Sequence, residues 1–131
     1  MNTPAPRVLV VDRDVHVRNL LDIILPEAGF QPIFMADGYA ALDHARRDPP
    51  EIVLTEIMVP RLDGLALCRL LKGDATTSGT KVLVLSVLAA EARALTSGAD
   101  AFIKKPIERI ALVEALRGLS PPAGRVGDTC T

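Results

Sequence analysis

Charged and hydroxyl side chains stand directly after four short hydrophobic runs of this sequence. These positions are Asp12, Arg13 and Asp14, then Glu56, then Ser86, and finally Lys104 and Lys105. If the runs are parallel strands, their carboxyl ends meet at one edge of a sheet, where binding groups gather in such folds. Two carboxylates, a hydroxyl, a guanidinium and an ammonium would then share one pocket.

Several of these residues also have a purely structural interpretation. Asp14 and Asp63 stand where they can cap helices, and Ser86 could be a turn residue. Lys104 is expected to be a solvated surface charge. The joint arrangement nevertheless favours a pocket, since capping alone does not account for a polar group at four of five strand ends.

The hydrophobic pattern predicts five strands that alternate with five helices. Strands that are apolar throughout, rather than at every second residue, indicate a parallel sheet covered by helices on both faces. The expected strands are Arg7–Val11, Pro32–Met35, Ile52–Thr55, Lys81–Ser86 and Asp100–Ile103, and the expected helices run from Asp14 to Gly29, then over Tyr39–Arg47, Gly64–Lys72, Leu88–Ser97 and Pro106–Leu119. The fold class is therefore α/β, a doubly wound five-stranded parallel sheet flanked by five helices.

One domain accounts for most of the 131 residues. We expect a leader over 1–6, the domain over 7–119, and a disordered tail or the start of a linker over 120–131, where Pro, Gly and polar residues show no periodicity. Pro26 lies inside the first helical pattern, so a kink or an early end is expected there.

Composition excludes some classes of partner and site. A net charge of −1 gives no broad positive field for nucleic acid, and no apolar run is long enough for a membrane span. The sequence has two cysteines, Cys68 and Cys130, which lie far apart, and this sparse use of cysteine is typical of proteins of the reducing cytoplasm. His16 and His44 lack a second ligand at metal spacing, so both are interpreted as helix-face histidines.

Five stretches resemble, in order and spacing, the receiver domain of bacterial response regulators. They are VLVVDRD, ADGYAAL, IVLTEIMVPRLDGL, KVLVLS and SGADAFIKKPI. The resemblance extends over residues 7–119 and implies the flavodoxin-like, CheY-like (βα)5 fold. It also implies a part in two-component phosphorelay signal transduction, in which a histidine kinase phosphorylates an aspartate at the end of the third strand.

Carried over position by position, the resemblance implies roles for several residues. Asp12 matches the first acid of a pair that binds Mg²⁺. Ser86 and Lys105 match the hydroxyl and the lysine that contact the phosphoryl group. Phe102 matches an aromatic residue that changes rotamer on activation, and the Lys105–Pro106 bond is expected to be cis.

Two positions depart from the family pattern. Glu56 stands at the phosphoacceptor position, where its extra methylene moves the nucleophilic oxygen by about 1 Å, and such a shift can cost about a hundredfold in rate. Arg13 replaces the second acid with a permanent positive charge, whereas Mg²⁺ needs oxygen ligands. The metal positions Asp12, Glu56 and Met58 would therefore form a degenerate site. We expect no cofactor, at most weak Mg²⁺ binding, and no catalytic residue.

Arg13 has two possible roles. It could reach the metal position and pair with Glu56 or Asp12, so that internal ion pairs replace metal and phosphate. Alternatively, it points into solvent beside a relic of the pocket. A further departure is the segment VLAAEARALTS, before Gly98, which is about one helical turn shorter than its usual counterpart.

The sequence favours an atypical receiver, a pseudo-receiver that signals without phosphorylation and acts as a protein–protein interaction module rather than an enzyme. We expect it to contact a protein partner or a second copy through Leu88–Ser97, Asp100–Ile103 and Pro106–Leu119, with a histidine kinase or an output domain as possible partners. Glu56 could mimic the phosphorylated state, or the domain could be fixed in one unrelated conformation.

An alternative is a receiver that still accepts phosphate, with Mg²⁺-dependent transfer to Asp12 or Glu56. A mass increase after incubation with a small phosphodonor would distinguish it. A flavodoxin-like cofactor binder is disfavoured, because the segment after the first strand contains no phosphate-binding glycine.

Overall fold

The protein is described by a computed structural model over residues 4–119. The strands are β1 (Arg7–Val11), β2 (Gln31–Met35), β3 (Ile52–Thr55), β4 (Lys81–Ser86) and β5 (Ala101–Lys104), and the helices are α1 (Val15–Glu27), α2 (Gly38–Arg47), α3 (Gly64–Gly73), α4 (Glu91–Thr96) and α5 (Arg109–Leu119). The expected tail over 120–131 lies outside the described residues, as does half of the expected leader.

The five strands form one parallel sheet in the order β2-β1-β3-β4-β5. The three inner strands are apolar and buried apart from polar residues at their ends, whereas the edge strands β2 and β5 are half-buried. Burial on both faces is what a continuously apolar strand requires. The predicted doubly wound α/β fold is therefore confirmed.

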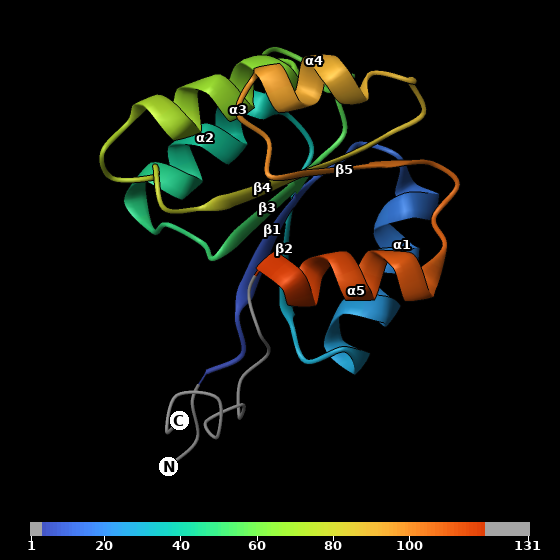
Figure 1. Ribbon diagram of the computed structural model, residues 1–131. Helices are drawn as coiled ribbons and strands as arrows, with labels where there is room; N and C mark the ends of the chain where they lie inside the picture. Colours follow the sequence, from blue (N-terminus) through green and yellow to red (C-terminus); the bar gives the residue numbers. More distant parts are fainter. Residues whose placement is uncertain (1–3, 120–131) are drawn as a thin grey trace.

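The helices cover the sheet in two layers, with α1 and α5 on one face and α2, α3 and α4 on the other (Figure 1). One core packs α1 and α5 on the sheet through Leu21, Leu25, Leu112 and Leu116. The other core packs the remaining helices through small and branched side chains such as Ala45, Leu67, Leu71 and Ala94. Both layers leave the carboxyl edge of the sheet open for the loops that follow the strands.

Aspartates begin the first three helices. Asp14, Asp37 and Asp63 each accept a hydrogen bond from a backbone N–H of the first turn. A carboxylate there satisfies a donor that the helix itself cannot pair. The predicted caps at Asp14 and Asp63 are confirmed, and α1 ends one residue after Pro26, so that proline lies in its last turn.

Two helices begin later than the hydrophobic pattern predicts. α4 begins at Glu91 rather than Leu88, because the backbone N–H groups of Val87 and Leu88 donate to side chains of the pocket instead of leading into a helix. α5 begins after Glu108, whose carboxylate accepts the Ala111 N–H. The prediction of helices over 88–97 and 106–119 was wrong at these ends.

The amino ends of β4 and β5 are joined to α3 by one ion pair. The Lys72 Nζ lies 2.8 Å from the Asp100 Oδ2 and also donates to the Thr80 carbonyl at 2.8 Å. The same Asp100 oxygen accepts the Val82 N–H at 2.8 Å. Asp100 was predicted to begin the last strand, but its side chain caps the sheet edge and the strand begins one residue later.

In the part of the chain that the structure describes, none of the helices has the length and apolar character needed to cross a bilayer.

Candidate functional site

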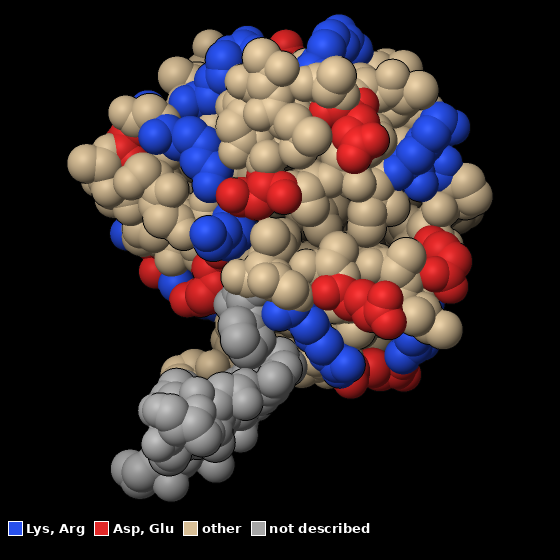
Figure 2. All heavy atoms as spheres, in the orientation of Figure 1, with Lys and Arg blue, Asp and Glu red and all other residues tan. Residues whose placement is uncertain are grey.

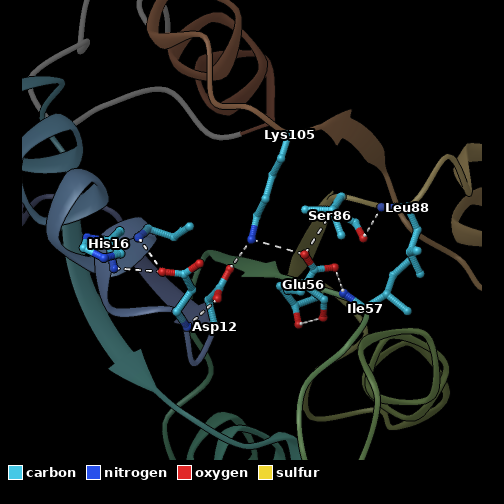
Figure 3. Close-up of polar contacts among 11 residues, drawn as sticks. Asp12, His16, Glu56, Ile57, Ser86, Leu88 and Lys105 are labelled. Carbon is cyan, nitrogen blue, oxygen red and sulfur yellow. Dashed lines mark hydrogen bonds and ion pairs between the residues drawn. The ribbon is translucent and has the colours of Figure 1, made fainter.

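The carboxyl edge of the sheet brings four of the predicted side chains together. Asp12 follows β1, Glu56 follows β3, Ser86 ends β4 and Lys105 follows β5. Asp12, Glu56 and Ser86 are buried, and the Lys105 side chain reaches across the gap toward both acids (Figure 3). The sheet order explains the meeting, because β1, β3, β4 and β5 are successive neighbours.

Lys105 is the centre of the pocket. Its Nζ lies 2.9 Å from the Asp12 Oδ2 and 3.1 Å from the Glu56 Oε2. Burial alone would lower the pKa of the Lys105 ammonium, but the two carboxylates outweigh burial and raise it. The cluster contains two acids and one base, so its formal net charge is −1.

The Glu56 carboxylate has backbone as well as side-chain partners. Its Oε1 accepts the Ile57 N–H at 2.6 Å, and its Oε2 accepts the Val87 N–H at 3.2 Å. Burial alone would raise the pKa of Glu56. Hydrogen bonds from Ser86, Lys105 and the Ile57 N–H outweigh burial and hold that pKa below its usual range. Glu56 is thus a fixed anion that links β3 to the loop after β4.

Asp12 also uses both of its oxygens. The Oδ1 accepts the Asp14 N–H at 2.9 Å, while the Oδ2 pairs with Lys105. Asp14 accepts the His16 and Val17 N–H groups, which lowers its own pKa, so the pocket acid is joined to the start of α1. Any ligand of Asp12 has to compete with these internal donors.

Ser86 shapes the loop above the pocket. Its hydroxyl oxygen accepts the Leu88 N–H at 3.1 Å, and its carbonyl accepts the Lys105 N–H at 2.7 Å. The Lys105–Pro106 bond is cis, the isomer that the resemblance implies. Ser86 therefore orients both the β4–α4 loop and the backbone that carries the lysine.

The loop after β3 is packed tightly against Glu56. A side chain at Gly64 would place its Cβ only 2.2 Å from the Glu56 carbonyl oxygen, so only glycine fits. The Gly64 N–H donates to the Ile57 carbonyl at 2.8 Å, and Arg61 turns the loop with a φ of 72°. Close backbone packing of this kind fixes the position from which the glutamate side chain extends.

Arg13 does not join the pocket. Its side chain is exposed, and no carboxylate within residues 4–119 lies within 4 Å of it. Of the two roles left open by the sequence, the solvent-facing one is observed, and Lys105 rather than Arg13 supplies the positive charge of the ion-pair network. Met58 is exposed as well, and Phe102 is half-buried against the core beneath α2, α3 and α4.

The sequence did not predict the backbone donors of the pocket, which hold Glu56 and Ser86. The N–H groups of Ile57, Val87 and Leu88 point into the site, and a backbone group leaves no trace in residue type. One signal was present. A glutamate reaches about 1 Å further than an aspartate, far enough to meet donors on the neighbouring loop.

The described residues do not fit a Mg²⁺ ion well. Mg²⁺ needs near-octahedral oxygen ligands, whereas both oxygens of Asp12 and of Glu56 already accept hydrogen bonds or pair with Lys105. Within residues 4–119, no three His, Cys, Asp or Glu side chains lie close enough together to hold a metal. The positive charge opposite the two carboxylates is supplied by the Lys105 ammonium.

Comparison with known proteins identifies a family. The response regulator receiver domain family matches residues 8–117. The chain is similar to the DNA-binding response regulator MtrA of Mycobacterium tuberculosis, with 35% identity over 89% of this chain and 51% of MtrA. It is also similar to the response regulator PleD of Caulobacter vibrioides, with 37% identity over 87% of this chain and 26% of PleD.

Solved structures agree with the sequence relatives. A putative response regulator from Chloroflexus aurantiacus superimposes with a TM-score of 0.83 at 26% identity, covering 87% of this chain and 96% of that one. This chain spans only about half the length of MtrA and about a quarter of PleD. The chain belongs to the response regulator receiver domain family of two-component signalling, whose members are signalling modules.

Proposed function

We propose that this receiver domain signals without being phosphorylated, and that the Glu56 carboxylate occupies the role of a phosphoryl group in the pocket. The main support for this proposal is the set of contacts that the carboxylate makes. It pairs with Lys105 at 3.1 Å, accepts the Val87 N–H at 3.2 Å and lies in hydrogen-bonding range of Ser86. The donors that a phosphoryl group would need therefore already bind the Glu56 carboxylate.

The Glu56 carboxylate reproduces only part of the charge of a phosphoryl group. A carboxylate carries about one negative charge, whereas a phosphoryl group carries nearly two. In this pocket one ammonium already faces two carboxylates, so the second negative charge of a phosphoryl group would have no cation opposite it among the described residues. The proposed state is therefore a permanent conformation of the β4–α4 loop with a weaker charge than a phosphorylated receiver.

Phosphotransfer to this pocket is disfavoured by the same contacts. A nucleophilic oxygen has to approach the phosphorus atom freely, yet each Glu56 oxygen is held by a backbone N–H. Phosphoryl transfer also relies on cations to neutralise developing charge, and the Lys105 ammonium is already paired with both carboxylates. We accordingly propose no catalytic residue and at most weak Mg²⁺ binding.

The proposed output is contact with a protein partner or a second copy of the chain through α4, β5 and α5. Leu95 on α4 and Ile110 on α5 are 48% and 66% exposed, which leaves apolar anchors on this surface. A histidine kinase or an output domain of the cytoplasm is the expected kind of partner. Direct contact with nucleic acid is not proposed, given the net charge of −1.

Incubation with acetyl phosphate and Mg²⁺, followed by intact mass measurement, tests the proposal. We expect no stable phosphate adduct. A near-stoichiometric adduct would overturn phosphorylation independence and support the alternative, a phospho-accepting receiver. Peptide mapping of the adduct would then distinguish Asp12 from Glu56.

A double substitution, Arg13→Asp with Glu56→Asp, examines whether the rest of the pocket is intact. It restores both acids of the family pattern while leaving Asp12, Ser86 and Lys105 unchanged. We expect Mg²⁺ binding and phosphorylation to return together in this variant. Either single substitution is the matched control, and continued inertness of the double variant would show that the pocket has diverged more widely.

A further inference from the structure

A groove between α3 and α4 lies away from the pocket. Its volume is about 390 Å³, and it is lined by Leu65, Arg69, Ala92, Arg93, Thr96 and Ser97. α4 has only six residues and forms one wall of the groove. A short helix covers less of its neighbour, which leaves the side of α3 accessible.

The groove is lined by two positive charges and by no negative one. Arg69 and Arg93 are exposed, and neither lies within 4 Å of a carboxylate in residues 4–119. Elsewhere in those residues, arginines such as Arg7 and Arg46 pair with aspartates. In Figure 2 basic side chains lie along the top of the molecule, where Figure 1 places α3 and α4, with acidic side chains among them.

Arg69 is held in place by a neutral partner. Its Nη1 donates to the Ser97 hydroxyl oxygen at 3.2 Å, and that hydroxyl donates to the Arg93 carbonyl at 2.9 Å. Ser97 is itself buried. The hydrogen bond restrains the guanidinium beside the groove without neutralising it, and a restrained donor loses less conformational entropy when it binds an anion.

Apolar surface accompanies the two charges. The exposed Ala92 lines the groove together with Leu65, whose side chain is mostly buried. A simple anion would use the arginines but leave this apolar surface in water. A ligand that matches the whole groove therefore combines carboxylates with an aliphatic side chain.

We propose that the α3–α4 groove binds an acidic segment of a partner protein, with one aliphatic side chain against Leu65 and Ala92 and carboxylates on Arg69 and Arg93. Charge complementarity is the basis for this occupant, because among residues 4–119 the groove offers two guanidinium groups that no acid pairs with, and no acid lines it. The groove shares α4 with the proposed α4–β5–α5 surface, but its other wall is α3, and the proposal does not depend on the role of Glu56.

A larger hollow beside α2 is a weaker candidate. It is lined by Tyr39, Arg46 and Arg61, among others, but its arginines are already engaged by acids. Arg46 pairs with Asp74, while Arg61 lies near Asp37 and stacks on the Tyr39 ring. Asp43 also lines that hollow, so it has no comparable unmet charge.

A capped peptide of alternating glutamate and leucine is the probe for the α3–α4 groove. Titration into the isotope-labelled chain, followed by backbone amide NMR, should shift the resonances of residues that line the groove. In the variant Arg69→Gln with Arg93→Gln we expect binding to weaken about tenfold, since each exposed ion pair contributes a few-fold in affinity. Arg117→Gln on α5 removes another exposed charge, outside the groove, and should leave affinity unchanged.

Three outcomes would overturn the proposal. The first is an absence of shifts up to millimolar peptide, and the second is equal binding by the double glutamine variant. The third is equal binding of a peptide in which serine replaces leucine, because the apolar surface would then have no part. Unchanged amide spectra of the free variants establish that the fold is intact in each case.

Discussion

Two lysine–carboxylate groups lie at opposite edges of the same sheet and differ in charge balance. The amino-edge pair consists of Lys72 and Asp100, and the carboxyl-edge cluster consists of Lys105 with Asp12 and Glu56. In both, a carboxylate also accepts a backbone N–H at one end of β4. Only the carboxyl-edge cluster has more acid than base.

The difference separates a structural contact from a candidate functional one. One ammonium with one carboxylate is neutral, and the two side chains of the amino-edge pair are 23% and 26% exposed. The carboxyl-edge cluster buries a net negative charge, with side-chain exposures of 11%, 5% and 6%. A buried group with more acid than base is stable only where other donors hold the second carboxylate, as the N–H groups of Ile57 and Val87 do for Glu56, and such groups gather at functional sites.

The largest expected effect is that of removing the shared lysine. Lys105→Met keeps the aliphatic stem but leaves two buried carboxylates without a cation, which should lower the free energy of unfolding by about 3 kcal/mol at neutral pH. The matched variant Lys72→Met should cost about 1 kcal/mol, because its partner remains accessible to water. Urea unfolding measures both, and equal losses would contradict the distinction between the two edges.

The next effect depends on pH. The pKa of Glu56 is lower in the folded chain than its ordinary value of 4.5, so its charge stabilises the fold above that value and the contribution disappears as pH falls through the lower folded pKa. Glu56→Gln should therefore cost about 1 to 2 kcal/mol at pH 7 and much less in strong acid. A cost that is independent of pH would show that packing, rather than charge, is what the substitution removes.

The three members of the carboxyl-edge cluster could be predicted from the sequence. Asp12, Glu56 and Lys105 each follow a strongly apolar strand, and parallel strands bring such positions to one edge. The exposed orientation of Arg13 could not be predicted, since the choice between solvent and ion pair depends on a rotamer and on competition from Lys105. Neither could the late start of α4, which results from backbone groups drawn toward Glu56 and Ser86.

Removing one hydroxyl at each edge of the sheet should lower the free energy of unfolding by a smaller amount, and it tests the difference between the two edges further. Ser86→Ala removes the acceptor of the Leu88 N–H, and Thr80→Val at the amino edge removes a donor to the Pro50 carbonyl. Each should cost about 1 kcal/mol. Only Ser86→Ala should accelerate hydrogen exchange in the β4–α4 loop, and similar acceleration in both variants would contradict a specific link from pocket to loop.

Arg13→Ala should have the smallest effect. The side chain is exposed and has no acid partner within residues 4–119, so the free energy of unfolding should change by less than about 0.5 kcal/mol. Thermal unfolding provides the measurement. A loss above about 1 kcal/mol would indicate that Arg13 contributes to the pocket in solution.

The bond between Glu56 and the Val87 N–H also bears on the evolutionary history of this pocket. Shortening Glu56 to aspartate alone would withdraw the carboxylate from that donor, while an acid at position 13 alone would add negative charge beside a cluster that already has a net charge of −1. Each single step toward the family pattern therefore carries an energetic cost of its own. Costs of this kind oppose reversion by one substitution at a time.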